Sequence, residues 1–427
     1  MLLDSAYVAN ISQLGLNFVR LGMMWAGVEP QPKQYNMSYL NVMKEIVEKL
    51  GKSQIFVLLD MHQDALSSRV QSYDGIPAWL YDRFPAPEQP YPWPFNSTPT
   101  SLSNIYLTEA CSHGFQCLYD NVANATDSMS DFWQLVASTF ADYSNVIGYE
   151  LINEPWAGNY LVNPMFLLPG IAGSTNLQPF YDKITRAIRS VDNKTLIFYQ
   201  PVPWGIHANG KYWGSGFSHV PGGVDYRDRS VLSYHYYCFL LTIDPVPRNS
   251  TIPFFERIFC DDIEGPAVFR SISIDLDILG GSAFLTEFGR CDSSPSCDEE
   301  FQWGLNSADK YLQSWAFWGE VSSTSQTSLA RVYARAIGGP PIAMQYNATE
   351  RSFYLSYNID ITINEPTEIF IPPLHFPQAS YTVTLDGPLK WNVDPNNENV
   401  ILITRTEQSV RNGNPNQVGT VIIKPKM

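Results

Sequence analysis

Two glutamates in this sequence follow short apolar runs and could act together as a catalytic pair. Glu154 lies in Asn-Glu-Pro at the end of one run, and Glu287 lies in Leu-Thr-Glu-Phe-Gly at the end of another. Two carboxyl groups that flank a glycosidic bond can protonate the leaving oxygen and attack the anomeric carbon, provided that they lie about 5 Å apart. We expect Glu154 to be the acid/base and Glu287 to be the nucleophile of a retaining mechanism.

Further polar side chains end other apolar runs, and such ends meet at one face of a parallel barrel. These side chains are Arg20, His62, Asp64, Asn153, His235, Tyr237 and Trp318. We expect Arg20 and Tyr237 to keep Glu287 ionised and Asn153 to bind a sugar 2-hydroxyl, while Glu154 needs a raised pKa to begin protonated. One such residue alone is more often a capping or solvated group, but this ordered set is improbable as an accident of packing.

Short runs rich in β-branched and aromatic residues alternate with helical patterns along most of the chain. The predicted strands are Phe18–Leu21, Ile55–Asp60, Ile147–Asn153, Leu196–Tyr199, Val231–His235, Ala283–Phe288 and Trp315–Trp318. The predicted helices are Tyr39–Leu50, Asp131–Tyr143, Phe180–Val191 and Asn306–Leu312. Continuous apolar strands between helices indicate an α/β fold with a buried parallel sheet, either a barrel or a doubly wound sheet.

The end of the chain has a different character. After the helix breaker Gly338-Gly339-Pro340-Pro341, strand-like runs are separated by Asn, Pro and Gly, which is typical of an antiparallel β-sandwich. These runs are Ser352–Tyr357, Glu368–Ile371, Tyr381–Leu385, Val400–Thr404 and Val418–Ile423. We therefore expect a catalytic domain over residues 1–336 and a β-sandwich over residues 337–427.

The motifs resemble those of glycoside hydrolase family 5, and of its endoglycoceramidase branch in particular, both in their residues and in their order along the chain. The phrases concerned are Val-Arg-Leu-Gly-Met-Met-Trp, Leu-Asp-Met-His-Gln-Asp, Asn-Glu-Pro and Thr-Glu-Phe-Gly. The resemblance spans essentially the whole chain. It implies a (β/α)8 TIM barrel with a C-terminal sandwich and hydrolysis between oligosaccharide and ceramide in glycosphingolipids. We expect no metal or other cofactor, because His62, Asp64 and His235 are explained as substrate contacts and no third ligand follows with metal-like spacing. The resemblance also implies sugar or carboxylate contacts at His62, Asp64, Asn153, His235, Tyr237 and Trp318.

The start of the sequence departs from the family pattern. Only seven barrel strands are predicted, and neither a signal peptide nor a first strand precedes Phe18–Leu21. We expect an N-terminally truncated barrel, for which a truncated gene model is a simpler explanation than a functional seven-stranded one. Two alternatives stay open, a related β-glycosidase acting on simple glycosylceramides or β-glucans, and a glycolipid-binding protein with impaired catalysis.

Composition limits the partners. The chain has 427 residues, 44% of them hydrophobic, and a formal net charge of -15, so nucleic acid is an improbable partner. Trp79 lies in an aromatic and Pro-rich stretch after the second strand, and Leu161–Ile171 is an apolar stretch after the third. Both stretches could receive the acyl tail of a glycosphingolipid and make transient contact with a membrane or micelle surface, although they could equally pack on each other.

The cysteines and Asn-x-Ser/Thr acceptors suggest a secreted or lysosomal, digestive compartment. Equal spacing pairs Cys111 with Cys117 and Cys291 with Cys297, which leaves Cys238 and Cys260 for a third disulfide; six free thiols are the alternative. The glycosylation acceptors are Asn10, Asn36, Asn96, Asn124, Asn193, Asn249 and Asn347.

Overall fold

The computed structural model describes residues 4–203, 214–238, 240, 252–289, 295–319, 321, 325–406 and 417–426. The chain divides into two compact units. One unit comprises Phe18–Cys238 and Ile258–Thr286, and the other comprises Met1–Asn17, Phe239–Arg257 and Glu287–Met427.

A seven-stranded sheet contains the predicted strands in the order β1 to β7, without a reversal. Its strands are β1 (Phe18–Gly22), β2 (Phe56–Asp60), β3 (Val146–Glu150), β4 (Leu196–Tyr199), β5 (Ser230–Tyr236), β6 (Ser282–Gly289) and β7 (Ser314–Trp318). Strands β1 to β5 pair in parallel with their neighbours. A doubly wound sheet reverses its strand order at a switch point, so the sequential order identifies the barrel alternative. All seven predicted strands are confirmed.

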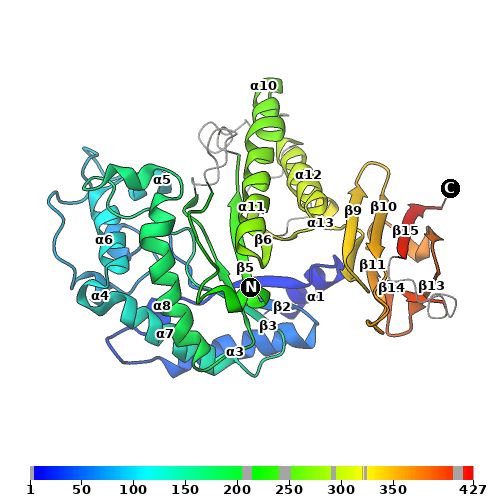
Figure 1. Cartoon of the computed structure of the whole chain (residues 1–427), viewed down its shortest axis with the longest axis horizontal. Coiled ribbons are helices and arrows are strands. Elements are labelled where there is room, and N and C mark those ends of the chain that lie inside the picture. Colours follow the sequence, from blue (N-terminus) through cyan, green and yellow to red (C-terminus); the bar gives the residue numbers. More distant parts are fainter. Residues whose placement is uncertain are drawn as a thin grey trace. The chain divides into compact units, whose positions relative to one another are not determined.

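Burial explains why these runs form inner strands. Every residue of β5 is buried, as are four of the five residues of β2, which matches a parallel sheet covered on both faces. The covering helices follow the strands, as Figure 1 shows for α3, α7, α8 and α11. Helix α3 (Met37–Lys52) begins where the Asn36 side chain accepts a hydrogen bond from the Tyr39 amide, and it buries one apolar stripe.

The other helices vary in length. The long ones are α7 (Ala125–Phe140), α8 (Gln178–Arg189), α11 (Gly265–Leu279) and α12 (Pro295–Lys310). The short ones are α1 (Ser5–Gln13), α2 (Trp25–Val28), α4 (Ala78–Tyr81), α5 (Leu102–Tyr106), α6 (Glu109–Tyr119), α10 (Phe254–Arg257) and α13 (Ser325–Leu329). The predicted helices correspond to α3, α7 and α8 and to the second half of α12.

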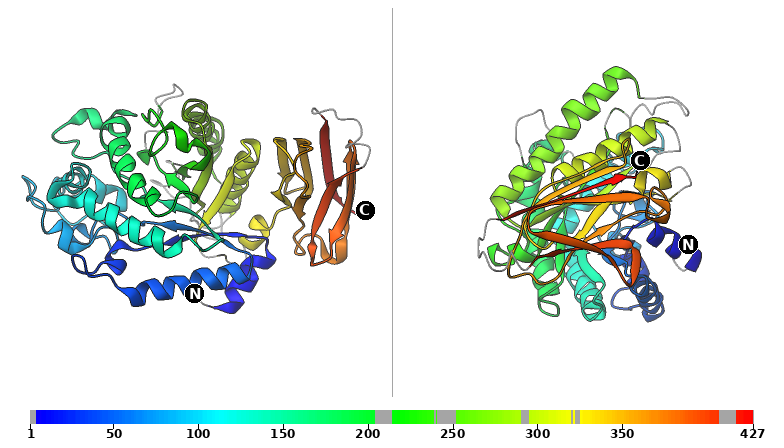
Figure 2. Two further views of the ribbon diagram at one scale, coloured as in Figure 1. Left: turned by 60° about the horizontal axis from the view of Figure 1, so that its bottom comes forward. Right: turned by 90° about the vertical axis from the view of Figure 1, so that its right-hand side faces the viewer.

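The C-terminal strands form two antiparallel sheets, with the orders β12-β15-β10-β9 and β13-β14-β11-β8. Their strands are β8 (Tyr333–Ala336), β9 (Pro341–Asn347), β10 (Ser352–Asn358), β11 (Thr367–Phe370), β12 (Tyr381–Asp386), β13 (Leu389–Asp394), β14 (Asn397–Arg405) and β15 (Val418–Pro425). The five predicted runs correspond to β10, β11, β12, β14 and β15. Figure 2 shows the two sheets face to face, and alternate residues such as Leu355, Ile401 and Val421 fill the core between them.

A buried ion pair connects α12 to the sandwich within the same unit. The Arg331 guanidinium lies 2.7 Å from Asp309 on α12, and the same carboxylate accepts a hydrogen bond from the Tyr346 amide on β9. Burial raises the pKa of Asp309, and the charge of Arg331 acts against that rise. The fold prediction of a parallel barrel sheet with a C-terminal antiparallel sandwich is confirmed.

The cysteine prediction is right for one pair and wrong for another. Cys238, just after β5, forms a disulfide with Cys260. Cys111 and Cys117 are free and buried, because both lie on helix α6. Six residues of α-helix rise by about 9 Å, which is longer than a disulfide can bridge. The third predicted pair, Cys291 with Cys297, lies outside the described side chains.

None of the helices in the described part of the chain combines the length and the apolar composition that a membrane-spanning helix requires.

Candidate active site

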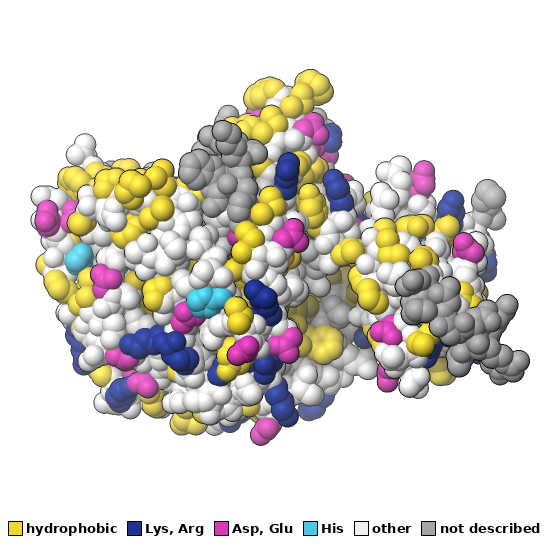
Figure 3. Space-filling model, viewed as in Figure 1, with side chains coloured by type: hydrophobic (Ala, Val, Ile, Leu, Met, Phe, Trp, Pro, Cys, Tyr) yellow, Lys and Arg dark blue, Asp and Glu magenta, His cyan; other side chains and the backbone are white. Residues whose placement is uncertain are grey.

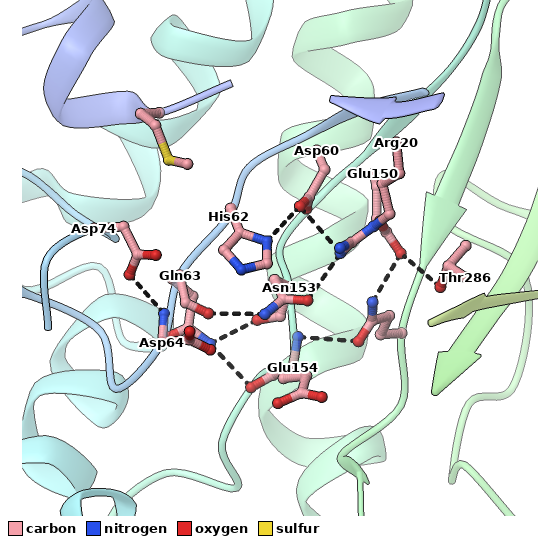
Figure 4. Close-up of polar contacts among 12 residues, drawn as sticks. Arg20, Asp60, His62, Gln63, Asp64, Asp74, Glu150, Asn153, Glu154 and Thr286 are labelled. Carbon is pink, nitrogen blue, oxygen red and sulfur yellow. Dashed lines mark hydrogen bonds and ion pairs between the residues drawn. The ribbon is translucent and has the colours of Figure 1, made fainter. Parts of the chain in front are cut away.

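A buried charge cluster lies at the carboxyl ends of the first three strands (Figure 4). Arg20 on β1 donates to Glu150 at the end of β3 and lies 3.1 Å from the Asp60 carboxylate at the end of β2. The same terminal nitrogen of Arg20, Nη2, also donates to the Asn153 side-chain oxygen at 2.8 Å. Since Asp60 and Glu150 are almost completely buried, Arg20 is the positive charge that offsets them.

His62 extends this cluster toward the loop after β2. Its Nδ1 lies 2.7 Å from the Asp60 carboxylate, which fixes the orientation of the ring. Burial alone would raise the pKa of Asp60, but the charge of Arg20 and the interaction with His62 outweigh it and lower that pKa. Asp60 is therefore an anion that positions both neighbours.

The backbone of Glu154 is strained and is held by two buried amides. Its φ angle is +36°, which is unusual for a residue with a side chain. The Glu154 N–H donates to Gln200 Oε1 at 2.9 Å, and the Glu154 carbonyl accepts from Gln63 Nε2 at 3.0 Å. A strained backbone costs of order 1–3 kcal/mol and persists where its surroundings fix it. These two amides therefore determine where the Glu154 side chain begins.

The Glu154 carboxyl group is held by a histidine with a defined tautomer. Gln200 Oε1 is occupied by the Glu154 N–H, so the Gln200 amide nitrogen donates both to Glu150 at 2.8 Å and to His235 Nε2 at 3.0 Å. His235 Nε2 then accepts, and Nδ1–H donates to Glu154 Oε1 at 2.7 Å. The remaining oxygen, Oε2, is therefore the one from which Glu154 can deliver a proton.

The expected rise in the pKa of Glu154 does not occur. Burial raises this pKa, but the hydrogen bond from His235 and the electrostatic attraction of its Nδ1–H, with smaller effects of Arg20 and His62, lower it overall. The expectation was wrong because it counted burial and omitted the donors that the fold brings to the carboxylate. The surroundings of Glu154 in the free protein therefore favour its carboxylate form.

Glu287 lies on β6 and is buried. The residue before it, Thr286, lies near two atoms at the carboxyl end of the sheet, Glu150 Oε1 and the Tyr234 carbonyl oxygen, both at 3.4 Å. Tyr237 directly follows β5, and Trp318 ends β7. Each of these residues thus has the strand-end position that its motif predicts, and their roles stay predictions. The contacts found for Arg20 are with Asp60, Glu150 and Asn153, so its predicted role at Glu287 also remains a prediction.

Asn153 is buried and engaged on both sides of its amide. Its Oδ1 accepts from Arg20, and its Nδ2 donates to the Gln63 carbonyl at 2.9 Å. This arrangement fixes which edge of the amide carries the donor. The predicted contact with a sugar 2-hydroxyl would use the second hydrogen on Nδ2 and stays a prediction.

The loop after β2 brings together a second polar group that spacing alone did not reveal. One side-chain atom each from His62, Asp64 and Asp74 lies within 4.8 Å of the other two. Asp74 Oδ1 accepts from the Asp64 amide at 2.8 Å and from the Ser72 hydroxyl at 2.6 Å. The sequence had offered no third residue beside His62 and Asp64, because Asp74 lies ten residues further along the loop.

Trp79 lies on α4 and is half-buried. Its indole nitrogen donates to the Glu29 carbonyl at 2.9 Å, and the Arg83 guanidinium lies 5.0 Å from its ring centre. The ring is therefore fixed in orientation. Helix α4, which carries it, lies in the segment after β2 that also contains Asp74.

Several important residues were not among the predicted ones. Asp60, Glu150 and Gln200 each end a strand or directly follow one, so the strand-end rule that selected the other residues would have found them. Gln63 and Asp74 lie in the loop after β2, where no periodic pattern points to them.

We expect Gln200→Leu to lower kcat/KM for an aryl β-glycoside about tenfold or more, because misplacing a reacting group by an ångström can cost about a hundredfold. The variant removes the acceptor for the Glu154 N–H and the donor that keeps His235 Nε2 unprotonated. A cationic His235 would lower the pKa of Glu154 further, so the decline of kcat/KM with increasing pH should begin at lower pH. Steady-state kinetics across pH measure both effects.

The matched control is Gln134→Leu, at an exposed glutamine of α7 that bonds only to Ser190 among the described residues. It should leave the pH profile unchanged. A Gln200→Leu profile that coincides with that of the parent would contradict the role of Gln200.

Comparisons with known proteins identify the family of the chain. The model of the cellulase family (glycosyl hydrolase family 5) matches residues 3–320, and that of the glycoside hydrolase family 5 C-terminal domain matches residues 331–418. Endoglycoceramidases of Cyanea nozakii and Hydra vulgaris are each 33% identical to the chain, covering 88% and 86% of it and 76% and 72% of their own lengths.

A solved structure of endo-glycoceramidase II from Rhodococcus sp., in a ganglioside GM3 complex, has the same fold. It superposes with a TM-score of 0.80 at 22% identity and covers 100% of this chain and 92% of its own. Together, the strand-end glutamates and the match of both family models show that the chain is a glycoside hydrolase and belongs to glycosyl hydrolase family 5.

Proposed function

We propose that this glycoside hydrolase cleaves the linkage between oligosaccharide and ceramide in glycosphingolipids and releases both parts intact. Two relatives that match most of the chain are named endoglycoceramidases. The similar Rhodococcus enzyme has been solved both with ganglioside GM3 and as a lactosyl-enzyme intermediate. These relatives support a glycolipid substrate over a soluble β-glucan.

The observation in this chain that carries the choice of a lipid-linked substrate is an exposed apolar loop after Glu154. Its exposed side chains are Leu161, Val162, Met165, Leu167, Leu168 and Ile171. The Tyr160 hydroxyl donates to the Leu107 carbonyl at the end of α5, so the loop starts beside that helix. Figure 3 shows hydrophobic side chains gathered at the upper left, where Figure 1 places α5. A soluble protein rarely exposes such a group of apolar side chains without a partner.

The chemistry would proceed in two steps. In the first, the Glu287 carboxylate attacks the anomeric carbon, the bond from that carbon to the ceramide oxygen breaks, and this oxygen takes the proton from Glu154 Oε2. In the second, water attacks the anomeric carbon, returns a proton to Glu154 and releases Glu287. His235 and Gln200 keep the Glu154 carboxyl in place in both steps.

The test compares a ganglioside, glucosylceramide, cellooligosaccharides and a soluble aryl glycoside as substrates for the protein and for Leu167→Ser/Leu168→Ser. We expect the protein to release intact oligosaccharide from the ganglioside. The double variant should lose about tenfold or more in ganglioside cleavage, since burying each leucine contributes about 1.5–3 kcal/mol, and should keep its activity on the aryl glycoside.

Val393→Ser is the matched control, because Val393 is exposed on β13. Equal losses on both substrates in the double variant would contradict the lipid-contact role. Turnover of cellooligosaccharides without any ganglioside cleavage would contradict the proposed substrate, and binding of glycolipid without turnover would favour a binding protein.

The proposed compartment is secretory or lysosomal, with transient contact between the apolar loop and a membrane or micelle surface. The disulfide between Cys238 and Cys260 suits an oxidising compartment. The acceptor residues Asn96, Asn124 and Asn193 are exposed and accessible to glycosylation. The intact mass of protein secreted by eukaryotic cells, before and after enzymatic deglycosylation, tests this; an unchanged mass would contradict it.

A further inference from the structure

Two side-chain amides, those of Gln116 and Asn176, pair at the base of the apolar loop that follows Glu154. Gln116 lies on α6, and Asn176 lies in the π-helical turn Gly173–Leu177 that leads into α8. Gln116 Nε2 donates to Asn176 Oδ1, and Asn176 Nδ2 donates to Gln116 Oε1, both at 3.3 Å. We call this pair the Gln116–Asn176 clasp.

The clasp also holds the backbone at the start of the apolar loop. Gln116 Oε1 accepts from the Asn159 amide at 3.1 Å, and Asn176 Nδ2 donates to the Ala157 carbonyl at 2.7 Å. Gly158 lies between these contacts, where a Cβ would come within 2.4 Å of Gln116 Oε1 and 2.7 Å of Asn176 Nδ2. Since Asn176 belongs to the chain that returns from the loop, the clasp ties the beginning of the loop to its end.

The partners of the clasp fix the orientation of both amides. The Asn159 N–H can only donate, so it faces Gln116 Oε1, while the Asp120 carboxylate accepts from Gln116 Nε2 at 3.0 Å. Asn176 is 4% exposed and uses both hydrogens of its amide nitrogen, one on Gln116 and one on Ala157. Replacing such a buried amide by a carboxylate or an apolar side chain leaves a partner without its hydrogen bond.

Further hydrogen bonds order the first half of the loop. The Asn159 side chain accepts from the Val162 amide at 3.3 Å, and the Asn159 carbonyl accepts from the Asn163 amide at 3.0 Å. Phe166, in the middle of the loop, is buried. The exposed apolar side chains of the loop therefore project from a backbone that is ordered in the free protein.

The catalytic glutamate does not depend on the clasp for its position. Glu154 is held through its backbone by Gln63 and Gln200, and the Trp156 carbonyl accepts from the Tyr119 hydroxyl at 2.6 Å. These contacts lie between the reacting carboxyl group and the start of the loop. Opening the clasp should therefore release the apolar loop and leave Glu154 in place.

We propose that Gln116 and Asn176 are positioning residues for the lipid-linked substrate, because they hold the apolar loop in the arrangement that receives the lipid. This inference rests on the proposed function and goes beyond it. A loop that is ordered in advance loses less conformational entropy when its ligand binds. The clasp should thus favour ceramide-linked substrates and contribute nothing to the cleavage of soluble ones.

The first test compares Gln116→Leu with the parent on a ganglioside in phosphatidylcholine vesicles and on a soluble aryl glycoside. The new side chain can neither accept from the Asn159 amide nor pair with Asn176. We expect kcat/KM to fall about tenfold or more for the ganglioside and to stay within about twofold for the aryl glycoside, because only the ganglioside needs the ordered loop. Faster hydrogen exchange in residues 157–171 of the variant should accompany the loss.

Asn176→Asp gives a second readout that a merely structural role would not move. The introduced carboxyl group would be buried and would face two acceptors, the Ala157 carbonyl and Gln116 Oε1, with the Asp120 carboxylate bonded to the same glutamine. All three raise its pKa. Below that pKa its O–H can donate to Ala157, and above it the carboxylate repels both oxygens. Ganglioside cleavage relative to the parent should therefore fall as the pH rises, while aryl glycoside cleavage should follow the parent at every pH.

Asn396→Asp, at an exposed asparagine between β13 and β14, is the control for the pH series and should follow the parent on both substrates. If one of the two clasp variants fails to fold, the other decides. Equal losses on both substrates, or an unchanged ratio of the two activities, would overturn the proposal. A parent protein that cleaves no ganglioside would instead refute the proposed function.

Discussion

Glu154→Gln is expected to lower the hydrolysis of a glycosphingolipid by about two to four orders of magnitude, the usual contribution of general acid–base catalysis. The ceramide alkoxide is a basic leaving group and needs the proton of Glu154 Oε2. A dinitrophenyl glycoside has an acidic leaving group and needs no proton, so its first step should be almost unaffected. Its second step still needs a base to activate water, so the variant should accumulate a glycosyl-enzyme intermediate.

The measurement is a pre-steady-state burst of dinitrophenolate, followed by intact mass of the trapped intermediate. Azide, which needs no base to act as a nucleophile, should restore turnover of Glu154→Gln. Glu287→Gln should show neither a burst nor rescue on the same substrate, because it lacks the attacking carboxylate. Glu45→Gln, at an exposed glutamate of α3, is the control. Equal loss on both substrates, without rescue, would contradict the assignment of Glu154.

The sequence predicts the inner part of this fold well, because the parallel strands are buried on both faces. Such strands appear as uninterrupted apolar runs, and β5 is buried along its full length. The strands missed in the C-terminal sandwich are β8, β9 and β13. In β9 and β13 most residues are exposed or half-buried, so hydrophobicity gives no strong signal there.

The residues of the candidate site could be predicted from the sequence where they end or follow such a buried apolar run. Glu154, His235 and Glu287 were found because each follows or ends a buried run. Gln200 does so too, but a glutamine after a strand has no distinctive motif, and its importance comes from three simultaneous hydrogen bonds. Asp74 was missed for another reason, since a long loop without regular spacing gives no indication of which of its residues fold back toward His62.

The cysteine error has a related origin. Equal spacing of Cys111 and Cys117 suggested a loop closed by a disulfide, whereas the segment forms helix α6, whose buried face includes both thiols. Burial raises the pKa of the Cys117 thiol to about 11, so this side chain acts as a small apolar group and not as a reactive thiol. Spacing alone does not distinguish a loop from a helix.

Arg20→Met should lower the free energy of unfolding by about 3–5 kcal/mol, the usual cost of removing one partner from a buried ion pair. The variant would leave Asp60 and Glu150 buried without their nearest positive charge. It also removes the donor to the Asn153 oxygen, so activity should fall together with stability. Urea denaturation followed by tryptophan fluorescence gives the loss. Arg257→Met is the control, because the Arg257–Glu299 pair is partly exposed and contributes little.

The pH dependence of that loss distinguishes an electrostatic role of Arg20 from simple packing. The pKa of Asp60 is lowered in the folded protein, so the stability that Asp60 contributes is present above its unfolded pKa and is lost as the pH falls through the folded value. Without Arg20, burial would dominate and raise the pKa of Asp60, so the folded variant would take up a proton at a higher pH than the unfolded chain does. The destabilisation should therefore be largest near pH 7 and smaller near pH 5. A loss that is independent of pH would mean that Arg20 contributes through its packing and not through its charge.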